Sequence, residues 1–219
     1  DLRMAYILAP YDVTLRAHAK MHKSVDVARQ QHEIGGASGI CCQKVSEAEV
    51  FARAGIADIL VTNQVFDPLK ITRLAGIAAT GCRLSVCVDD LANIAALSAE
   101  AVKQNTQIRC LVELECGAGR CGVSHPDEVT ALAVAIDAAD GLIFDGLQAY
   151  HGSIQHEQGY GQRKQVLDHV IMKVKACLES LSQAGLTCRV VSGGGTGSFL
   201  FEAASGVYTE IQCGSYAFM

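Results

Sequence analysis

A buried strand, a turn and an amphipathic helix follow one another along almost the whole chain of 219 residues. Strands that alternate with helices form parallel sheets, because each crossover helix returns the chain to the same end of the sheet. Eight such units predict an α/β fold closed as a (β/α)8 TIM-type barrel, in one domain over residues 1–219. An open doubly wound sheet, which usually has about five or six strands, ranks second. The expected strands are 13–20, 37–42, 58–62, 84–88, 108–115, 142–149, 188–192 and 208–212, and the first seven precede a helical pattern.

Local signals set the helix boundaries. The helix after strand 37–42 is expected from Ser46, which with Glu47 makes a good helix start, and the long helix after strand 142–149 is expected from about Arg163. Glycine accepts the left-handed conformation that ends a helix. Four glycines fall at expected helix ends: Gly55, Gly76, Gly81 and Gly185.

Composition limits the partners and the compartment. A net charge of −5 argues against nucleic acid or an anionic membrane surface as partner, and the sequence contains no apolar run long enough to cross a bilayer. The ten cysteines lack the spacing of a disulfide or zinc framework, so we expect reduced thiols and a cytoplasmic protein. The sequence starts at Asp1 without a methionine and ends at Met219 soon after a strand, as an excerpt of a longer chain would.

Lys20 lies near the carboxyl end of the first strand, just before the helix expected after Ser24. In α/β proteins this end of the strands carries the chemistry. A lysine that enters a walled pocket loses hydration, its pKa falls, and the neutral amine is able to form a Schiff base. The alternative is that Lys20 and Lys23 form a solvated turn pair.

A glycine-rich loop follows the seventh strand, and a shorter one follows the eighth. The first is Ser192-Gly-Gly-Gly195-Thr196-Gly197-Ser198, and the second is Gly214-Ser215-Tyr216. Backbone N–H groups in such loops bind anions, and loops after strands seven and eight form the usual phosphate site of this barrel. The alternative is a tight turn with a helix cap.

A phosphate site and a lysine on one rim together suggest pyridoxal phosphate. Arg120 would then bond the phenolate oxygen of the cofactor, unless it is a surface arginine on a glycine loop. Gln212 would face the pyridine nitrogen or Lys20, or else serve as a hydrogen-bonded strand end. A neutral amide there would not enforce a pyridinium.

Two histidines, His151 and His156, share the loop after the sixth strand. Either is a candidate general base or metal ligand, and a structural role is the alternative. His18 precedes Lys20 by two residues on the same strand face, and we interpret it as a support for the lysine.

Six blocks in the right order resemble the D-threonine aldolase family, and more remotely the barrel of alanine racemase. The blocks Lys20-Met-His-Lys-Ser-Val-Asp26 and Cys116-Gly-Ala-Gly-Arg-Cys-Gly122 are most similar to its 3-hydroxy-D-aspartate aldolase branch. The six blocks are 16–24, 39–47, 119–123, 146–152, 192–197 and 212–216. Ala17 stands where the family commonly has proline.

The resemblance implies roles for particular residues. Lys20 would hold the cofactor aldehyde, and His156 would deprotonate the β-hydroxyl of the substrate. The other cofactor contacts fall into three groups: Arg120 at the phenolate oxygen; Gln43 and Tyr150 along the ring; Thr196, Gly214 and Ser215 at the phosphate.

The resemblance also implies an enzyme that uses pyridoxal phosphate and a divalent metal (manganese, magnesium or cobalt). It would cleave D-3-hydroxy amino acids, D-threonine or 3-hydroxy-D-aspartate, to glycine and acetaldehyde or glyoxylate. The family's metal ligands belong to a second, β-rich domain that this sequence lacks, so no metal ligand is assigned here. Barrels of this kind often pair across the active-site face, and we expect a homodimer.

Two other functions stay open. A D-serine or 3-hydroxy-D-aspartate dehydratase would use the same scaffold and cofactor but lose water instead of an aldehyde. A lone barrel of this size also resembles the pyridoxal-phosphate carrier proteins, which bind the cofactor without turnover.

Overall fold

The computed structural model describes residues 2–218, so Asp1 and Met219, the ends of the predicted domain, lie outside the described residues. Eight parallel strands close into a barrel in chain order, with β8 paired to β1. This closure confirms the predicted barrel and excludes the open doubly wound sheet. The strands are β1 (Thr14–His18), β2 (Ala37–Cys42), β3 (Asp58–Val61), β4 (Arg83–Val88), β5 (Ile108–Glu113), β6 (Leu142–Ala149), β7 (Val190–Gly193) and β8 (Glu210–Ile211).

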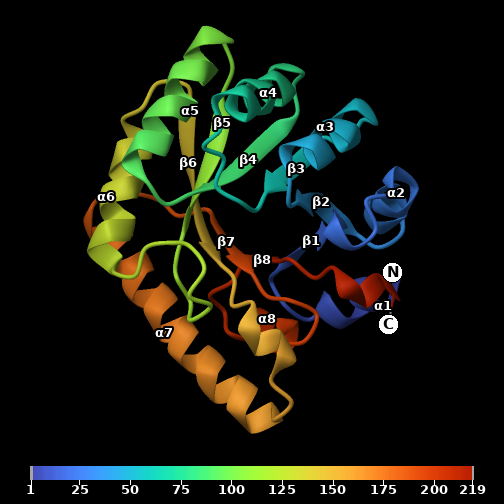
Figure 1. The fold of residues 1–219 in the computed structure, drawn as a ribbon. Helices are drawn as coiled ribbons and strands as arrows, with labels where there is room; N and C mark the ends of the chain where they lie inside the picture. Colours follow the sequence, from blue (N-terminus) through green and yellow to red (C-terminus); the bar gives the residue numbers. More distant parts are fainter. Residues whose placement is uncertain (1, 219) are drawn as a thin grey trace.

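The α-helices form a layer outside the strands, as Figure 1 shows. A helix follows each of β1 to β7, as predicted, and α1 (Leu2–Leu8) precedes the barrel. The helices are α2 (Val25–Glu33), α3 (Val45–Arg53), α4 (Pro68–Ala79), α5 (Leu91–Lys103), α6 (Pro126–Asp137), α7 (Tyr160–Gln183) and α8 (Phe199–Ala204). Three short 3-10 turns lie in loops at the carboxyl ends of strands: η1 (Ala19–Met21), η2 (Ser153–His156) and η3 (Ser215–Phe218).

Some boundaries differ from the sequence-based expectations. Gly76 does not end a helix: it lies inside α4, and the chain turns only at Gly81, where φ is +88°. The helix continues past Gly76 because Ile77 and Ala78 are buried in the core. Helix α7 begins at Tyr160, three residues before Arg163, and the Tyr160 ring lies 5.0 Å from the ring of Phe201 at a tilted angle.

Helix α3 begins one residue before the expected Ser46. Lys44 takes the N-cap position, and the Glu47 carboxylate accepts hydrogen bonds from the backbone N–H groups of Gln43 and Lys44. This arrangement satisfies donors that a helix start leaves free. The same contacts hold Gln43, a predicted site residue, at the end of β2.

Alternation along the strands creates two apolar regions. Outward residues such as Ile40 and Ile59 join the main core beneath the helices. Their inward neighbours Cys41 and Leu60 belong to a smaller cluster with Cys87 and Leu111. The barrel interior is therefore packed side chains rather than a pore, as in other barrels of this class. All ten cysteines are free thiols.

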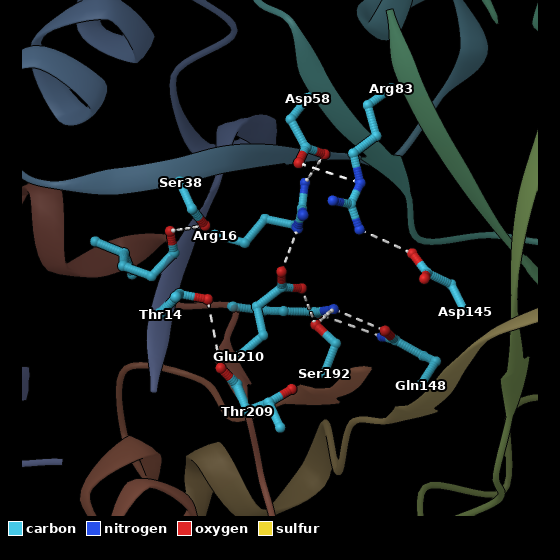
Figure 2. Close-up of polar contacts among 12 residues, drawn as sticks. Thr14, Arg16, Ser38, Asp58, Arg83, Asp145, Gln148, Ser192, Thr209 and Glu210 are labelled. Carbon is cyan, nitrogen blue, oxygen red and sulfur yellow. Dashed lines mark hydrogen bonds and ion pairs between the residues drawn. The ribbon is translucent and has the colours of Figure 1, made fainter. Parts of the chain in front are cut away.

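Charged side chains fill the interior near the amino ends of the strands. Arg16 of β1 is 5% exposed, and it pairs with Asp58 at 2.6 Å and with Glu210 at 2.7 Å. Burial alone would lower the pKa of Arg16, but Glu210 and Asp58 outweigh burial and raise it. Figure 2 shows this ion-pair group continuing through Arg83 to Asp145. Within residues 2–218, no helix is both long enough and apolar enough to span a bilayer.

Candidate active site

Lys20 lies on η1, the 3-10 turn between β1 and α2, and not on the strand itself. The backbone N–H of Lys20 donates a hydrogen bond to Nδ1 of His18 at 3.4 Å. The turn therefore brings the lysine side chain over the carboxyl mouth of the barrel, at the strand-to-helix junction that the sequence indicated. The solvated pair with Lys23 does not form: Lys23 reaches Glu47 at 3.4 Å.

The Lys20 amine lies in a partly dehydrated, cationic environment. Burial is the main cause that lowers the pKa of Lys20, and the nearby Arg120 guanidinium lowers it further. The amine lies 5.9 Å from the centre of the Tyr150 ring, whose electron-rich face attracts a cation. Both neighbours line the same narrow part of the mouth as Lys20. A lowered pKa makes more of the neutral, nucleophilic amine available near neutral pH.

His18 supports the lysine as expected, and it does so as a neutral imidazole. Its side chain is 6% exposed, and burial together with Lys20 lowers the pKa of His18 to about 3. Its Nε2 hydrogen-bonds the Thr62 hydroxyl at 3.2 Å, and Nδ1 accepts from the Lys20 backbone. The ring is therefore fixed at both nitrogens and holds the Lys20 turn in place.

The two predicted glycine loops border one cavity with Lys20. The cavity measures about 440 Å³, within the range of small-molecule sites. A Cβ added at Gly214 would lie 2.9 Å from the His18 carbonyl oxygen, so a side chain there would collide with the end of β1, just before the Lys20 turn. The lining includes Lys20, Tyr150, Gln155, His156, Gly195, Thr196, Gly197, Gln212, Gly214 and Ser215.

The predicted loop residue Tyr216 takes a different position from its neighbours. Its backbone N–H donates to the Thr196 hydroxyl at 3.1 Å and joins the two loops. Its own hydroxyl accepts from Gln31 of α2 at 3.1 Å, away from the cavity lining. Tyr216 thus ties the loops to α2 through its side chain.

Gln155 is a part of this loop region that the sequence did not indicate. Its amide nitrogen donates to the Ser198 hydroxyl at 2.7 Å, and its amide oxygen accepts from the Gly197 backbone at 2.8 Å. It therefore links the loop after β6 to the loop after β7. Its position between two histidines gave no signal in the sequence.

Arg120 forms an ion pair with a buried carboxylate at the mouth. Glu113, at the end of β5 and 3% exposed, pairs with Arg120 at 3.4 Å and accepts from Gln64 at 2.7 Å and the Cys121 thiol at 3.0 Å. Arg120 is 51% exposed, as the surface alternative expects, but it also lines the same part of the mouth as Lys20 and Tyr150, so its contact with the cofactor stays a prediction. An acidic residue at the end of a mostly apolar strand was the available signal for Glu113.

The two histidines of the η2 loop have different environments. His151 is 7% exposed, and its Nδ1 accepts from the Ile154 backbone at 3.3 Å, so it shapes the loop. Burial lowers its pKa. His156 is exposed and lines the cavity with Lys20. His156 is therefore the histidine of this loop that a cavity ligand can contact.

Gln212 lies at the cavity wall, where it was predicted, but its amide bonds to the barrel interior. It is 3% exposed, it exchanges hydrogen bonds with Gln148, and it donates one to the Ser192 hydroxyl. The alternative of a hydrogen-bonded strand end is therefore present, and the contact with the cofactor ring or Lys20 stays a prediction. Gln43 and Asn63 complete the opposite wall of the mouth.

Glu202 of α8 is a buried acid behind the first glycine loop. It is 1% exposed, and its Oε1 accepts from the Ser198 hydroxyl at 2.9 Å. Burial raises the pKa of Glu202 to about 7, and the bond from Ser198 opposes the shift. The folded protein therefore holds the proton of this acid more strongly than a solvated carboxyl group would.

We predict that this acid makes stability depend on pH. Its pKa is raised from 4.5 unfolded to about 7 folded. The stabilisation is thus complete below about pH 4.5 and is lost as pH rises through 7, with an upper limit of about 3 kcal/mol. Urea unfolding at pH 5 and pH 8 measures the loss. The variant Glu202→Gln should lose correspondingly less stability over that interval, and equal losses in both proteins would contradict this assignment.

The residues of the mouth fit pyridoxal phosphate. An amine of lowered pKa suits an aldehyde, and the glycine loops with the Thr196 and Ser215 hydroxyls suit a phosphate. They do not provide a metal site: residues 2–218 contain no group of three or more histidine, cysteine, aspartate or glutamate side chains arranged to hold an ion.

This barrel, with a lysine turn after its first strand and glycine loops after the last two, belongs to the family described as alanine racemase, N-terminal domain, which it matches over residues 3–219. Among its relatives is the 3-hydroxy-D-aspartate aldolase of Paracoccus denitrificans (strain Pd 1222), 55% identical over 93% of this chain and 53% of the relative. The D-threo-3-hydroxyaspartate dehydratase of Delftia sp. (strain HT23) is 32% identical over 99% of this chain and 57% of that protein.

A solved structure of a D-threonine aldolase is also similar to this chain. The D-threonine aldolase from Filomicrobium marinum superposes with a TM-score of 0.97 at 43% identity, over 100% of this chain and 58% of that one. The resemblance to the D-threonine aldolase family is thereby confirmed. The chain spans about half the length of the curated relatives it matches.

Proposed function

We propose that the protein containing this chain is a pyridoxal-phosphate-dependent aldolase for D-3-hydroxy amino acids. The observation that carries the proposal is that the Lys20 amine and both glycine loops line one cavity. The names and identities of the aldolase relatives support the reaction class. The substrates we propose are 3-hydroxy-D-aspartate, cleaved to glycine and glyoxylate, and D-threonine, cleaved to glycine and acetaldehyde.

Each residue of the mouth has a task in this proposal. Lys20 attaches the cofactor through its aldehyde carbon, and Arg120 holds the phenolate oxygen. The backbone of Gly195 and Gly214 and the hydroxyls of Thr196 and Ser215 hold the phosphate. Gln43 and Tyr150 border the ring. When bound, pyridoxal phosphate withdraws the electrons of the bond that breaks.

His156 is the base of the reaction. It lines the cavity beside Lys20, exposed to an entering substrate. We propose that its imidazole takes the proton from the substrate β-hydroxyl as the Cα–Cβ bond breaks, so that the hydroxyl carbon leaves as an aldehyde and glycine remains.

Three features of the proposal concern the whole protein. A divalent metal (manganese, magnesium or cobalt) would take its ligands from outside this chain, and no step above depends on it. We propose a homodimer that pairs across the barrel mouth, and a cytoplasmic location in keeping with ten free thiols.

A dehydratase is the second candidate, because the Delftia relative carries that name. Incubating the full-length holoprotein with 3-hydroxy-D-aspartate and D-threonine, with and without manganese, separates the two. Glycine with an aldehyde is the expected result. Oxaloacetate from 3-hydroxy-D-aspartate, or pyruvate from D-serine in a parallel incubation, would favour the dehydratase. Bound cofactor without any product would favour the carrier protein.

A further inference from the structure

Four buried side chains form a line from the floor of the barrel to the active-site mouth, drawn for the most part in Figure 2. Arg16 Nε lies 2.7 Å from Glu210 Oε2, and Glu210 Oε1 lies 2.5 Å from the Ser192 hydroxyl. The Ser192 oxygen lies 2.8 Å from Nε2 of Gln212. All four are at most 5% exposed, the figure for Arg16.

The direction of every hydrogen bond in this line is determined. Glu210 is paired with an arginine, so its carboxylate is ionised and only accepts. The hydroxyl of Ser192 has one hydrogen, and it donates this hydrogen to Glu210 in a hydrogen bond. Ser192 must therefore accept from its other neighbour, and that neighbour, Gln212, must present its NH2 group.

The second hydrogen of that NH2 group is also used inside the barrel. Gln212 Nε2 donates to Gln148 Oε1 at 2.7 Å, and Gln148 Nε2 returns a bond to Gln212 Oε1 at 3.1 Å. Because both hydrogens are already in hydrogen bonds, the amide of Gln212 can form only one further bond, in which the second lone pair of its oxygen accepts. Gln212 lines the cavity that also holds Lys20.

We propose that Arg16, Glu210 and Ser192 are positioning residues that fix the Gln212 amide with its NH2 group turned inward, so that it can only accept a hydrogen bond from a ligand in the cavity. The amide then favours, without enforcing, a protonated ring nitrogen of the cofactor. The opposite amide orientation would offer a donor and favour the unprotonated ring. The part of this inference that concerns the ring nitrogen rests on the proposed function. The part that concerns the amide stands on the protein alone.

The amide is tested in the cofactor-free protein. Nuclear magnetic resonance follows hydrogen exchange of the Gln212 side-chain NH2 in the wild type and in Ser192→Ala. We expect slow exchange of both hydrogens in the wild type and exchange about three- to tenfold faster in the variant, because one bond is lost. The control Ser38→Ala removes a serine hydroxyl that donates to the Leu15 carbonyl on the neighbouring strand. It should match the wild type.

The ring nitrogen is tested in the holoprotein with ¹⁵N-labelled pyridoxal phosphate. The expected chemical shift is that of a protonated ring in the wild type and in Ser38→Ala. In Gln212→Met, which removes the amide but leaves Ser192 paired with Glu210, the shift should move to that of an unprotonated ring, and so should Ser192→Ala. Since the methionine variant leaves the ion pair intact, it gives an answer even where Ser192→Ala fails to fold.

Two results would overturn the inference. One is fast exchange of the Gln212 hydrogens in the wild type, equal to that in Ser192→Ala. The other is an unprotonated ring nitrogen in the wild-type holoprotein. A protein that binds no cofactor would refute the proposed function instead, while the exchange experiment would still decide the orientation of the amide.

Discussion

Replacement of Lys20 by methionine is expected to abolish the visible absorbance of bound pyridoxal phosphate and to lower turnover by about a thousandfold or more. The variant keeps most of the side-chain length but removes the amine that attaches the cofactor. The glycine loops and Arg120 do not depend on that amine, so the protein should still fold and bind the phosphate weakly. Absorbance and glycine formation measure the two losses.

Lys23→Met provides the matched control for this prediction. Lys23 lies three residues later in the same connection between β1 and α2, is 59% exposed, and pairs with Glu47. It should retain both the absorbance and the turnover. Borohydride reduction followed by peptide mapping should place the label on Lys20 in the wild type. Label on another lysine, or a Lys20→Met protein that stays yellow after reduction, would refute the assignment.

The barrel was predictable because one pattern repeats eight times. Each strand carries its own apolar run, and each crossover helix has its own start and stop signals. The closure follows from the number of units, and β8, only two residues long, was visible as 208–212 from its place in the series. The helix boundaries were less predictable: Gly76 resembles a stop locally, but its buried neighbours Ile77 and Ala78 keep α4 going.

Residues at the ends of strands were predictable for a related reason. In a parallel barrel every strand delivers its last residues to one face, so Lys20, Arg120, Tyr150 and the glycine loops could be brought together from the order of the chain. The structure places these groups around one mouth.

The residues behind the mouth could not be found in this way. Gln155 and Gln148 act through partners far away in the sequence, and their type is common on any surface. Glu202 bonds Ser198, only four residues earlier, but its burial is not visible in the sequence. The direction of Tyr216 is a similar case: the loop position was correct, but its hydroxyl is taken by Gln31 of α2, 185 residues earlier in the chain. Such pairings depend on side-chain packing across the barrel, which a single sequence does not encode in any local pattern.

Replacement of His156 by alanine is expected to leave the cofactor absorbance intact and to lower turnover by about a hundredfold to ten-thousandfold, the usual contribution of a general base. The expected separation follows from the geometry, because His156 lines the cavity from η2 without any described bond to the glycine loops or to Lys20. Absorbance, the KM for 3-hydroxy-D-aspartate and the rate of glycine formation should be measured together, with His169→Ala as control. His169 is an exposed histidine of α7 whose Nδ1 contacts the Gln165 carbonyl oxygen at 2.7 Å, and its loss should change none of the three. Since a base acts on the proton in the transition state, kcat should fall while KM changes little.

Full turnover in His156→Ala would remove this residue from the mechanism and leave the proton of the β-hydroxyl to another group at the mouth.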